Sequence, residues 1–92
     1  MNTTATATLN NFEVRKLTDK NLQEYFMIIN NDNRDEVYFC FRGTIDEKGW
    51  EILNRSPLPL NIEIEYMEQK DERTGRIFKR AKSLYTDDDI IV

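Results

Sequence analysis

The chain has 92 residues, of which 39% are hydrophobic and 33% are charged, and its formal net charge is −4. This length predicts one domain with one hydrophobic core, and an aromatic content of 11% argues against disorder along the whole chain. The sequence has no histidine and a single cysteine, Cys40. This composition excludes Ser-His-Asp and Cys-His catalytic sites, and also zinc sites built from histidine and several cysteines. We therefore expect a non-enzymatic domain with no metal and no cofactor.

The single cysteine also bears on location. Cys40 lies in the apolar run VYFCF and cannot form an internal disulfide, so we interpret it as a packed small hydrophobic residue. The sequence shows neither a charged-then-apolar leader nor an apolar run of about 18 residues. These features predict a cytoplasmic domain with no membrane span.

The first third of the chain predicts two strands. Residues 1–9 are small, Thr-rich and uncharged, which is typical of a flexible N-terminus or an edge extension. From Asn10 onward, Phe12 and Val14 alternate with charged residues as in a strand, and TDKN at 18–21 is rich in turn formers. The segment 25–29 is apolar on both faces and ends at the polar NNDNRD. It therefore reads as a central strand.

A third strand is predicted over 37–45. Val37, Phe39 and Phe41 share one face, and Tyr38, Cys40 and Arg42 share the other. We assign the face with Phe39 and Phe41 to the core and the face with Tyr38 and Arg42 to the surface. Gly43 near the end of this strand predicts a bulge or a bend.

A short helix follows at about 46–54. Thr44 and Glu47 have capping-box spacing, although Asp46 is an equally good N-cap. Trp50 and Leu53 fall on one helical face, and we expect Trp50 to close one end of the barrel. The prolines of SPLP at 56–59 end the helix.

Two further strands complete the chain. From Leu60 to Met67 apolar and polar residues alternate, so one face should be buried, with Ile62 and Ile64 in the core. The turn KDERTG leads to a last strand at about 76–85, in which neither face is wholly apolar, and this pattern predicts a bulge or an edge position. Residues 87–92 read as an acidic C-terminal tail.

The predicted order over residues 10–86 is three strands, a helix and two strands. This order resembles the OB-fold, a five-stranded Greek-key barrel whose ligands lie across strands two and three and the loops 1–2 and 4–5. We therefore expect a mainly β domain, a five-stranded OB-like barrel with one short helix. An SH3-like barrel, or a meander with one helix, is the alternative.

The resemblance directs attention to aromatic and basic residues, because single-strand binders stack bases on aromatic rings and hold phosphates with cations. The segment 70–82, called here the basic hairpin, has six basic residues and two acidic ones in an otherwise acidic chain. The candidate nucleic-acid-binding residues are Tyr25, Tyr38, Arg42, Lys70, Arg73, Arg76, Lys79, Arg80 and Lys82. The alternative is that these cations neutralise Glu63, Glu65 and Glu68 across a two-stranded ribbon.

The end of the chain carries a second resemblance. Asp87, Asp88, Asp89 and Ile90 are similar to the acidic tip of bacterial single-stranded-DNA-binding proteins, in which an Asp triplet and apolar residues dock partner proteins. The chain departs from that family in ending Ile91-Val92 instead of Pro-Phe, and in lacking a long Gly/Gln-rich linker. The resemblance implies a partner-binding role for these four residues, whereas an acidic end that only maintains solubility is the alternative.

Two functional hypotheses follow. The first is a small module that binds single-stranded DNA or RNA weakly through the basic hairpin and the aromatic residues. The second is a protein-interaction or assembly domain, with a protein partner or a second copy, in which the segregation of charge between the basic hairpin and the acidic remainder directs docking.

Overall fold

The computed structural model describes residues 4–55 and 57–86 and shows a mainly β domain with one helix. The elements are β1 (Thr4–Leu9), β2 (Phe12–Thr18), β3 (Glu24–Asn30), β4 (Val37–Phe41), α1 (Glu47–Leu53), β5 (Ile62–Lys70) and β6 (Ile77–Thr86). Together the strands form one six-stranded sheet with the order β1-β5-β6-β4-β3-β2. All neighbours are antiparallel except β4 and β6, which are parallel.

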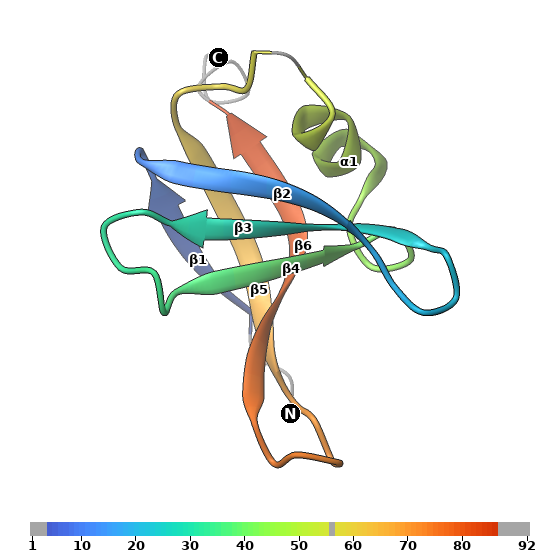
Figure 1. Ribbon diagram of the computed structural model, residues 1–92. Coiled ribbons are helices and arrows are strands. Elements are labelled where there is room, and N and C mark those ends of the chain that lie inside the picture. Colours follow the sequence, from blue (N-terminus) through green and yellow to red (C-terminus); the bar gives the residue numbers. More distant parts are fainter. Residues whose placement is uncertain (1–3, 56, 87–92) are drawn as a thin grey trace.

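The sheet folds over itself into two layers. In Figure 1, β2, β3 and β4 cross in front of β1, β5 and β6, and α1 lies at one end of the crossing. The two edge strands, β1 and β2, are consecutive in the chain and are separated by only Asn10 and Asn11. Leu9 and Phe12 are three residue steps apart, a span of at most about 11 Å, so the two edges of the sheet must lie close together at that point. Within the described residues these edges are not hydrogen-bonded to each other, and the expected closed five-stranded barrel is therefore not observed.

The N-terminal segment differs from the flexible terminus that the composition favours. Residues 4–9 form β1 and pair in antiparallel register with β5, from Thr4 opposite Met67 to Leu9 opposite Ile62. Ala7 and Leu9 contact the hydrophobic core, which explains the attachment of a segment with little local signal. Of the two alternatives, the edge extension is the one that the structure has, and it supplies the sixth strand.

The core lies between the two layers. Its buried residues come from the helix, from every strand except β2, and from the turn before the helix. They are Leu9, Phe26, Ile28, Tyr38, Cys40, Ile45, Ile52, Leu53, Ile62, Ile64, Ala81 and Leu84. The expected burial of Ile62 and Ile64 is confirmed. Trp50 is partly buried and packs against Phe26 with the ring centroids 4.8 Å apart, where α1 covers one end of the core.

Several element boundaries differ from the sequence-based expectation for local reasons. β4 ends at Phe41 instead of continuing to Ile45, because the Phe41 carbonyl accepts hydrogen bonds from the amides of Thr44 and Ile45 and so closes a turn. β5 begins at Ile62, and Leu60 is 84% exposed. The helix is capped by Asp46, whose side chain accepts a hydrogen bond from the Gly49 amide, so the Asp46 alternative is correct.

The bulge expected in the last strand is present. Glu65 pairs with Ser83 and Tyr66 pairs with Ala81, so Lys82 is the extra residue in β6. The bulge explains why neither face of this strand is wholly apolar in the sequence. Ala81 and Leu84 are three residues apart, and the extra residue between them lets both side chains reach the core. The alternative edge position is wrong, since β6 pairs with β4 on one side and with β5 on the other.

Candidate nucleic-acid interface

The two faces of β4 are reversed relative to the sequence-based assignment. Tyr38 is 1% exposed and Cys40 is fully buried, whereas Phe39 and Phe41 are only half-buried and face away from the core. The reason is that the neighbouring positions of β3 in the sheet, Ile28 and Phe26, are themselves core residues. The apolar run VYFCF contains no polar residue to distinguish the faces, although the presence of Cys40, a residue type that is most often fully buried, favours the observed orientation.

Tyr38 is buried and makes contacts inside the domain. Its hydroxyl donates a hydrogen bond to the Glu36 carboxylate, and its ring packs edge-on against Tyr66 with the centroids 5.1 Å apart. Burial, together with the hydrogen bond to Glu36, raises the pKa of the Tyr38 phenol well above its usual range. A ring held in this way is not available for stacking on a base.

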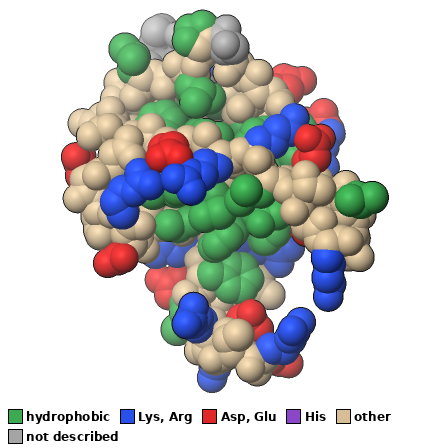
Figure 2. Space-filling view, viewed as in Figure 1, with side chains coloured by type: hydrophobic (Ala, Val, Ile, Leu, Met, Phe, Trp, Pro, Cys, Tyr) green, Lys and Arg blue, Asp and Glu red, His purple; other side chains and the backbone are tan. Residues whose placement is uncertain are grey.

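The outer face carries a row of aromatic rings instead. The Tyr25 and Phe41 centroids are 5.4 Å apart, those of Phe39 and Phe41 are 6.1 Å apart with nearly parallel planes, and those of Phe39 and Phe78 are 5.9 Å apart. We call these four rings, Tyr25, Phe39, Phe41 and Phe78, the aromatic row. It joins β3, β4 and β6, and Figure 2 shows apolar side chains gathered over the middle of this view of the molecule.

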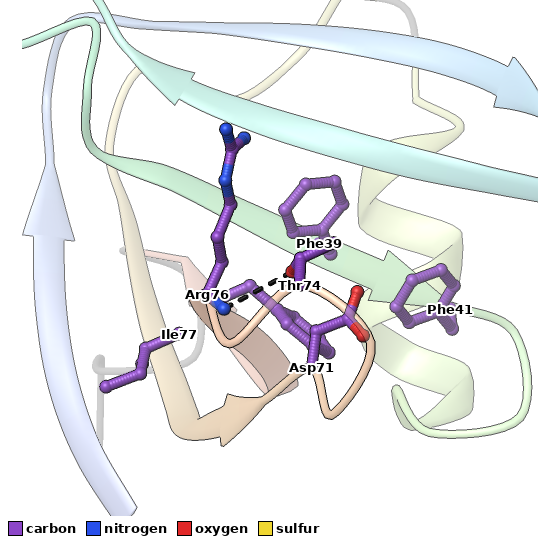
Figure 3. Close-up of a pocket in the computed structure, with 7 residues that line it drawn as sticks. Phe39, Phe41, Asp71, Thr74, Arg76 and Ile77 are labelled. Carbon is purple, nitrogen blue, oxygen red and sulfur yellow. Dashed lines mark hydrogen bonds between the residues drawn. The ribbon is translucent and has the colours of Figure 1, made fainter.

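A groove of about 490 Å³ runs along one side of the aromatic row. It is lined by Phe39, Phe41, Asp71, Thr74, Arg76, Ile77 and Phe78. The groove thus lies between β4 and the turn that joins β5 to β6, as Figure 3 shows. The rings form its floor, and the loop of the basic hairpin forms its wall.

The wall is built by a tight turn. The Asp71 amide donates to the Arg76 carbonyl at 2.8 Å, and the Asp71 carbonyl accepts from the Gly75 amide at 2.7 Å. Gly75 has a φ of +73°, a conformation that a side chain disfavours. The Asp71 carboxylate accepts from the Arg73 amide at 2.9 Å. These bonds fix the position of the loop against the rings.

Two basic residues of the hairpin adjoin this groove. Arg80 places its guanidinium carbon 5.1 Å from the Phe41 ring centroid and donates to the Gln69 side chain at 2.8 Å. Its Nε is buried and has no hydrogen-bond partner among the described residues. Arg76 is exposed and lines the groove, and in Figure 3 its side chain extends from the hairpin loop past Phe39.

The other predicted cations lie elsewhere on the hairpin. Lys70 and Arg73 are exposed near its tip. Lys79 faces the core side, with its ammonium 5.3 Å from the Tyr38 centroid and 5.6 Å from the Tyr66 centroid. Lys82, at the bulge, is half-buried, and its carbonyl accepts a hydrogen bond from the Asp46 amide.

The alternative, that glutamates neutralise the hairpin, is not observed. Within residues 4–55 and 57–86, none of the six hairpin cations forms an ion pair with a carboxylate, and the ion pairs of these residues join other parts of the chain. Glu68 lies opposite Lys79 in the strand register, yet the two form no ion pair. The cations beside the groove therefore keep their positive charge available for an anionic ligand.

Arg42 does not belong to the aromatic row. Its guanidinium forms an ion pair with Glu47 at 2.7 Å and lies 5.1 Å from the centroid of the Trp50 ring. It lines a separate cavity of about 540 Å³ together with Gln23, Glu24, Gly43 and Trp50. Three predicted binding residues lie outside the basic hairpin, namely Tyr25, Tyr38 and Arg42, and of these only Tyr25 lies on the aromatic row.

Three rings and one carboxylate were missed by sequence reasoning. Phe39 and Phe41 were assigned to the core, Phe78 was not singled out, and Asp71 was counted only as a charge in a basic turn. The predicted partner-binding residues Asp87, Asp88, Asp89 and Ile90 lie outside the described residues. Cys40 is buried as expected, and burial raises the pKa of its thiol.

Comparisons with known proteins give no further assignment. No family model, curated protein or solved structure matches this chain. Among the described residues, no helix is long and apolar enough to cross a membrane.

Proposed function

We propose that this domain binds single-stranded nucleic acid along the groove between the aromatic row and the loop of the basic hairpin. One observation carries the proposal: flat, partly exposed rings lie beside guanidinium groups that are not paired with a carboxylate in the described part of the chain. Proteins that bind single strands without reading their sequence combine these two features, because rings stack on bases and cations track the phosphates.

The spacing of the rings supports stacking. Phe39 and Phe41 are two residues apart on one strand face, and their planes differ by 7°. These two rings offer nearly parallel faces on which bases can stack, and each stacked base contributes about 1–3 kcal/mol. Arg80, whose guanidinium carbon lies 5.1 Å from the Phe41 ring centroid, adds a cation beside the rings.

We also propose that the sheet is an OB-type barrel of the partly open kind. This is supported by the element order after β1 and by the two sheet edges that meet across Asn10 and Asn11. In an OB-fold, ligands lie on strands two and three and the loop between strands four and five. Counted from β2, those elements are β3, β4 and the turn 71–76, which form the proposed groove.

The single thiol of Cys40 supports the expected cytoplasmic location.

A salt-dependent titration with a fluorescent single-stranded DNA or RNA tests the proposal. The affinity should fall steeply with salt, because each neutralised phosphate adds about 0.7 to the slope of log K against log salt. Arg76→Glu should reduce that slope by about 0.7 and weaken binding about equally for all base sequences. Arg55→Glu is the matched control, since Arg55 is exposed at the end of α1 and does not line the groove.

Two results would overturn the proposal. The first is that the folded protein has no detectable affinity for single-stranded DNA or RNA at about 50 mM salt, where electrostatic attraction is strong. The second is that Arg76→Glu and Arg55→Glu weaken binding equally, since a general charge effect does not require a site. Either result would favour the protein-docking hypothesis.

A further inference from the structure

Among the described residues, Asp71 is the one acidic residue that lines the groove, and a phosphate-binding surface alone does not explain it. A carboxylate repels phosphate and lowers the affinity of any anionic ligand that approaches it. Asp71 is nevertheless half-buried at the groove, while residues 72–77 beside it are all exposed. Its placement is therefore a feature that the proposed function must accommodate.

The carboxylate is held in position while keeping an acceptor free. Its backbone amide and carbonyl are both engaged in the turn, and its Oδ1 accepts a hydrogen bond from the Arg73 amide at 2.9 Å. Its Oδ2 accepts no hydrogen bond from the described residues, and no described cation pairs with it. A carboxylate has about four acceptor positions, so most of its capacity remains unused at a fixed site.

The Asp71 carboxylate points toward the rings (Figure 3). Figure 3 shows the Asp71 carboxylate pointing from the hairpin loop toward the side of the groove where Phe41 lies. The Arg76 side chain extends on the other side of Thr74 in the same view. A nucleotide whose base stacks on Phe41 and whose phosphate lies toward Arg76 would present the edge of its base to Asp71.

We propose that Asp71 selects, among the bases that stack in this groove, those that carry an exocyclic amino group. This inference rests on the proposed function. Cytosine, adenine and guanine offer an amino N–H to a carboxylate, as in the known pairing of Asp or Glu with the cytosine N4 amino group. Thymine and uracil present a carbonyl oxygen at the equivalent position, which a carboxylate repels. Asp71 thereby turns a sequence-tolerant stacking groove into one with a base preference.

Cytosine and thymine allow the sharpest comparison, because both are pyrimidines. Oligonucleotides of these two bases with equal length also carry the same number of phosphates. The experiment titrates the protein with fluorescent oligo-dC and oligo-dT of about 12 nucleotides, within the roughly 4–16 nucleotides that such a domain covers. We expect oligo-dC to bind about tenfold more tightly, which is the effect of one hydrogen bond to a charged group.

Asp71→Asn isolates the contribution of the carboxylate. Asparagine keeps an oxygen that can accept from the Arg73 amide, so the turn is retained, but it replaces the free acceptor with an amide donor. The preference for oligo-dC should then disappear or reverse, because the thymine O4 accepts from that donor. Glu72→Gln is the matched control: it removes one negative charge from the adjacent exposed residue, which does not line the groove. This variant should retain the preference while raising both affinities.

The possible results separate the inference from the proposed function. Equal affinity of the native protein for oligo-dC and oligo-dT would overturn the base preference and leave nucleic-acid binding intact. A preference that survives Asp71→Asn would overturn the role of Asp71. Failure to bind either oligonucleotide would overturn the proposed function and the inference with it. The comparison on the native protein remains decisive even where a variant fails to fold.

Discussion

The adjacent residues Tyr38 and Phe39 make opposite contributions to the domain, and truncating each to alanine separates stability from binding. Tyr38 is 1% exposed, packs on Tyr66 and anchors its hydroxyl on Glu36. Phe39 is half-buried on the opposite face and packs on two other rings of the aromatic row. Both substitutions remove an aromatic ring from the same strand, so the change in β-propensity is shared by the two variants.

The expected magnitudes differ enough to measure. Tyr38→Ala removes a fully buried ring and leaves a cavity, which costs about 3–5 kcal/mol, a large part of a stability that is ordinarily about 5–15 kcal/mol. The melting temperature should fall by more than about 10 °C. Phe39→Ala should cost only about 1 kcal/mol, because a surface ring buries less area and leaves no closed cavity. It should instead weaken single-strand binding by about 1–3 kcal/mol.

Denaturant unfolding measures the first quantity and fluorescence anisotropy the second. Trp50 is the single tryptophan of the chain and packs against Phe26, so its emission reports the integrity of the core during unfolding. The assignment of the two faces is refuted if Phe39→Ala destabilises the domain as much as Tyr38→Ala does. The stacking role is refuted if Phe39→Ala, still folded, binds single strands with unchanged affinity and salt dependence.

Two further predictions concern the core. Ile64 is fully buried between the layers, so Ile64→Ala should lower the free energy of unfolding by about 2–5 kcal/mol, as measured by urea unfolding. A loss below about 0.5 kcal/mol would contradict its central position. Burial raises the pKa of the Cys40 thiol, so the folded state resists its ionisation. Stability should therefore be fully retained below the ordinary thiol pKa of about 8.5 and decrease as pH rises above it. Replacing Cys40 by alanine should remove this part of the alkaline destabilisation, and an unchanged pH profile would argue against the assignment.

Local signals were sufficient for much of the fold. Alternation between Leu60 and Met67 correctly gave the burial of Ile62 and Ile64. The N-cap candidates around residue 46, together with the prolines at 57 and 59, located α1 to within a residue at each end. The bulge in β6 was foreseeable because no single register buries a continuous apolar face of that strand. In each of these cases the residues that decide the structure lie within a few positions of one another.

The errors arose where distant contacts decide. β1 has no local strand pattern that distinguishes it from a frayed end, and its attachment depends on β5, almost sixty residues away in the chain. The inside and the outside of β4 depend on Phe26 and Ile28 of the neighbouring strand, since both faces of VYFCF are apolar. A strand whose two faces are both apolar carries no periodic signal, so its orientation can be resolved only by its neighbours in the sheet.

The reversed orientation of β4 also explains why aromatic rings and a cation lie together in the candidate site. With Phe39 and Phe41 outside, the parallel pairing of β4 with β6 brings Phe39 opposite Arg80, so rings and cations from the two segments share one face. Had Tyr38 faced outward, its partner Lys79 would share that outer face, and Arg80 would lie on the core side. The parallel register therefore links the choice of β4 face to the chemistry of the groove. Only the observed choice puts the planar guanidinium of Arg80, whose fork suits phosphate, beside stacked rings.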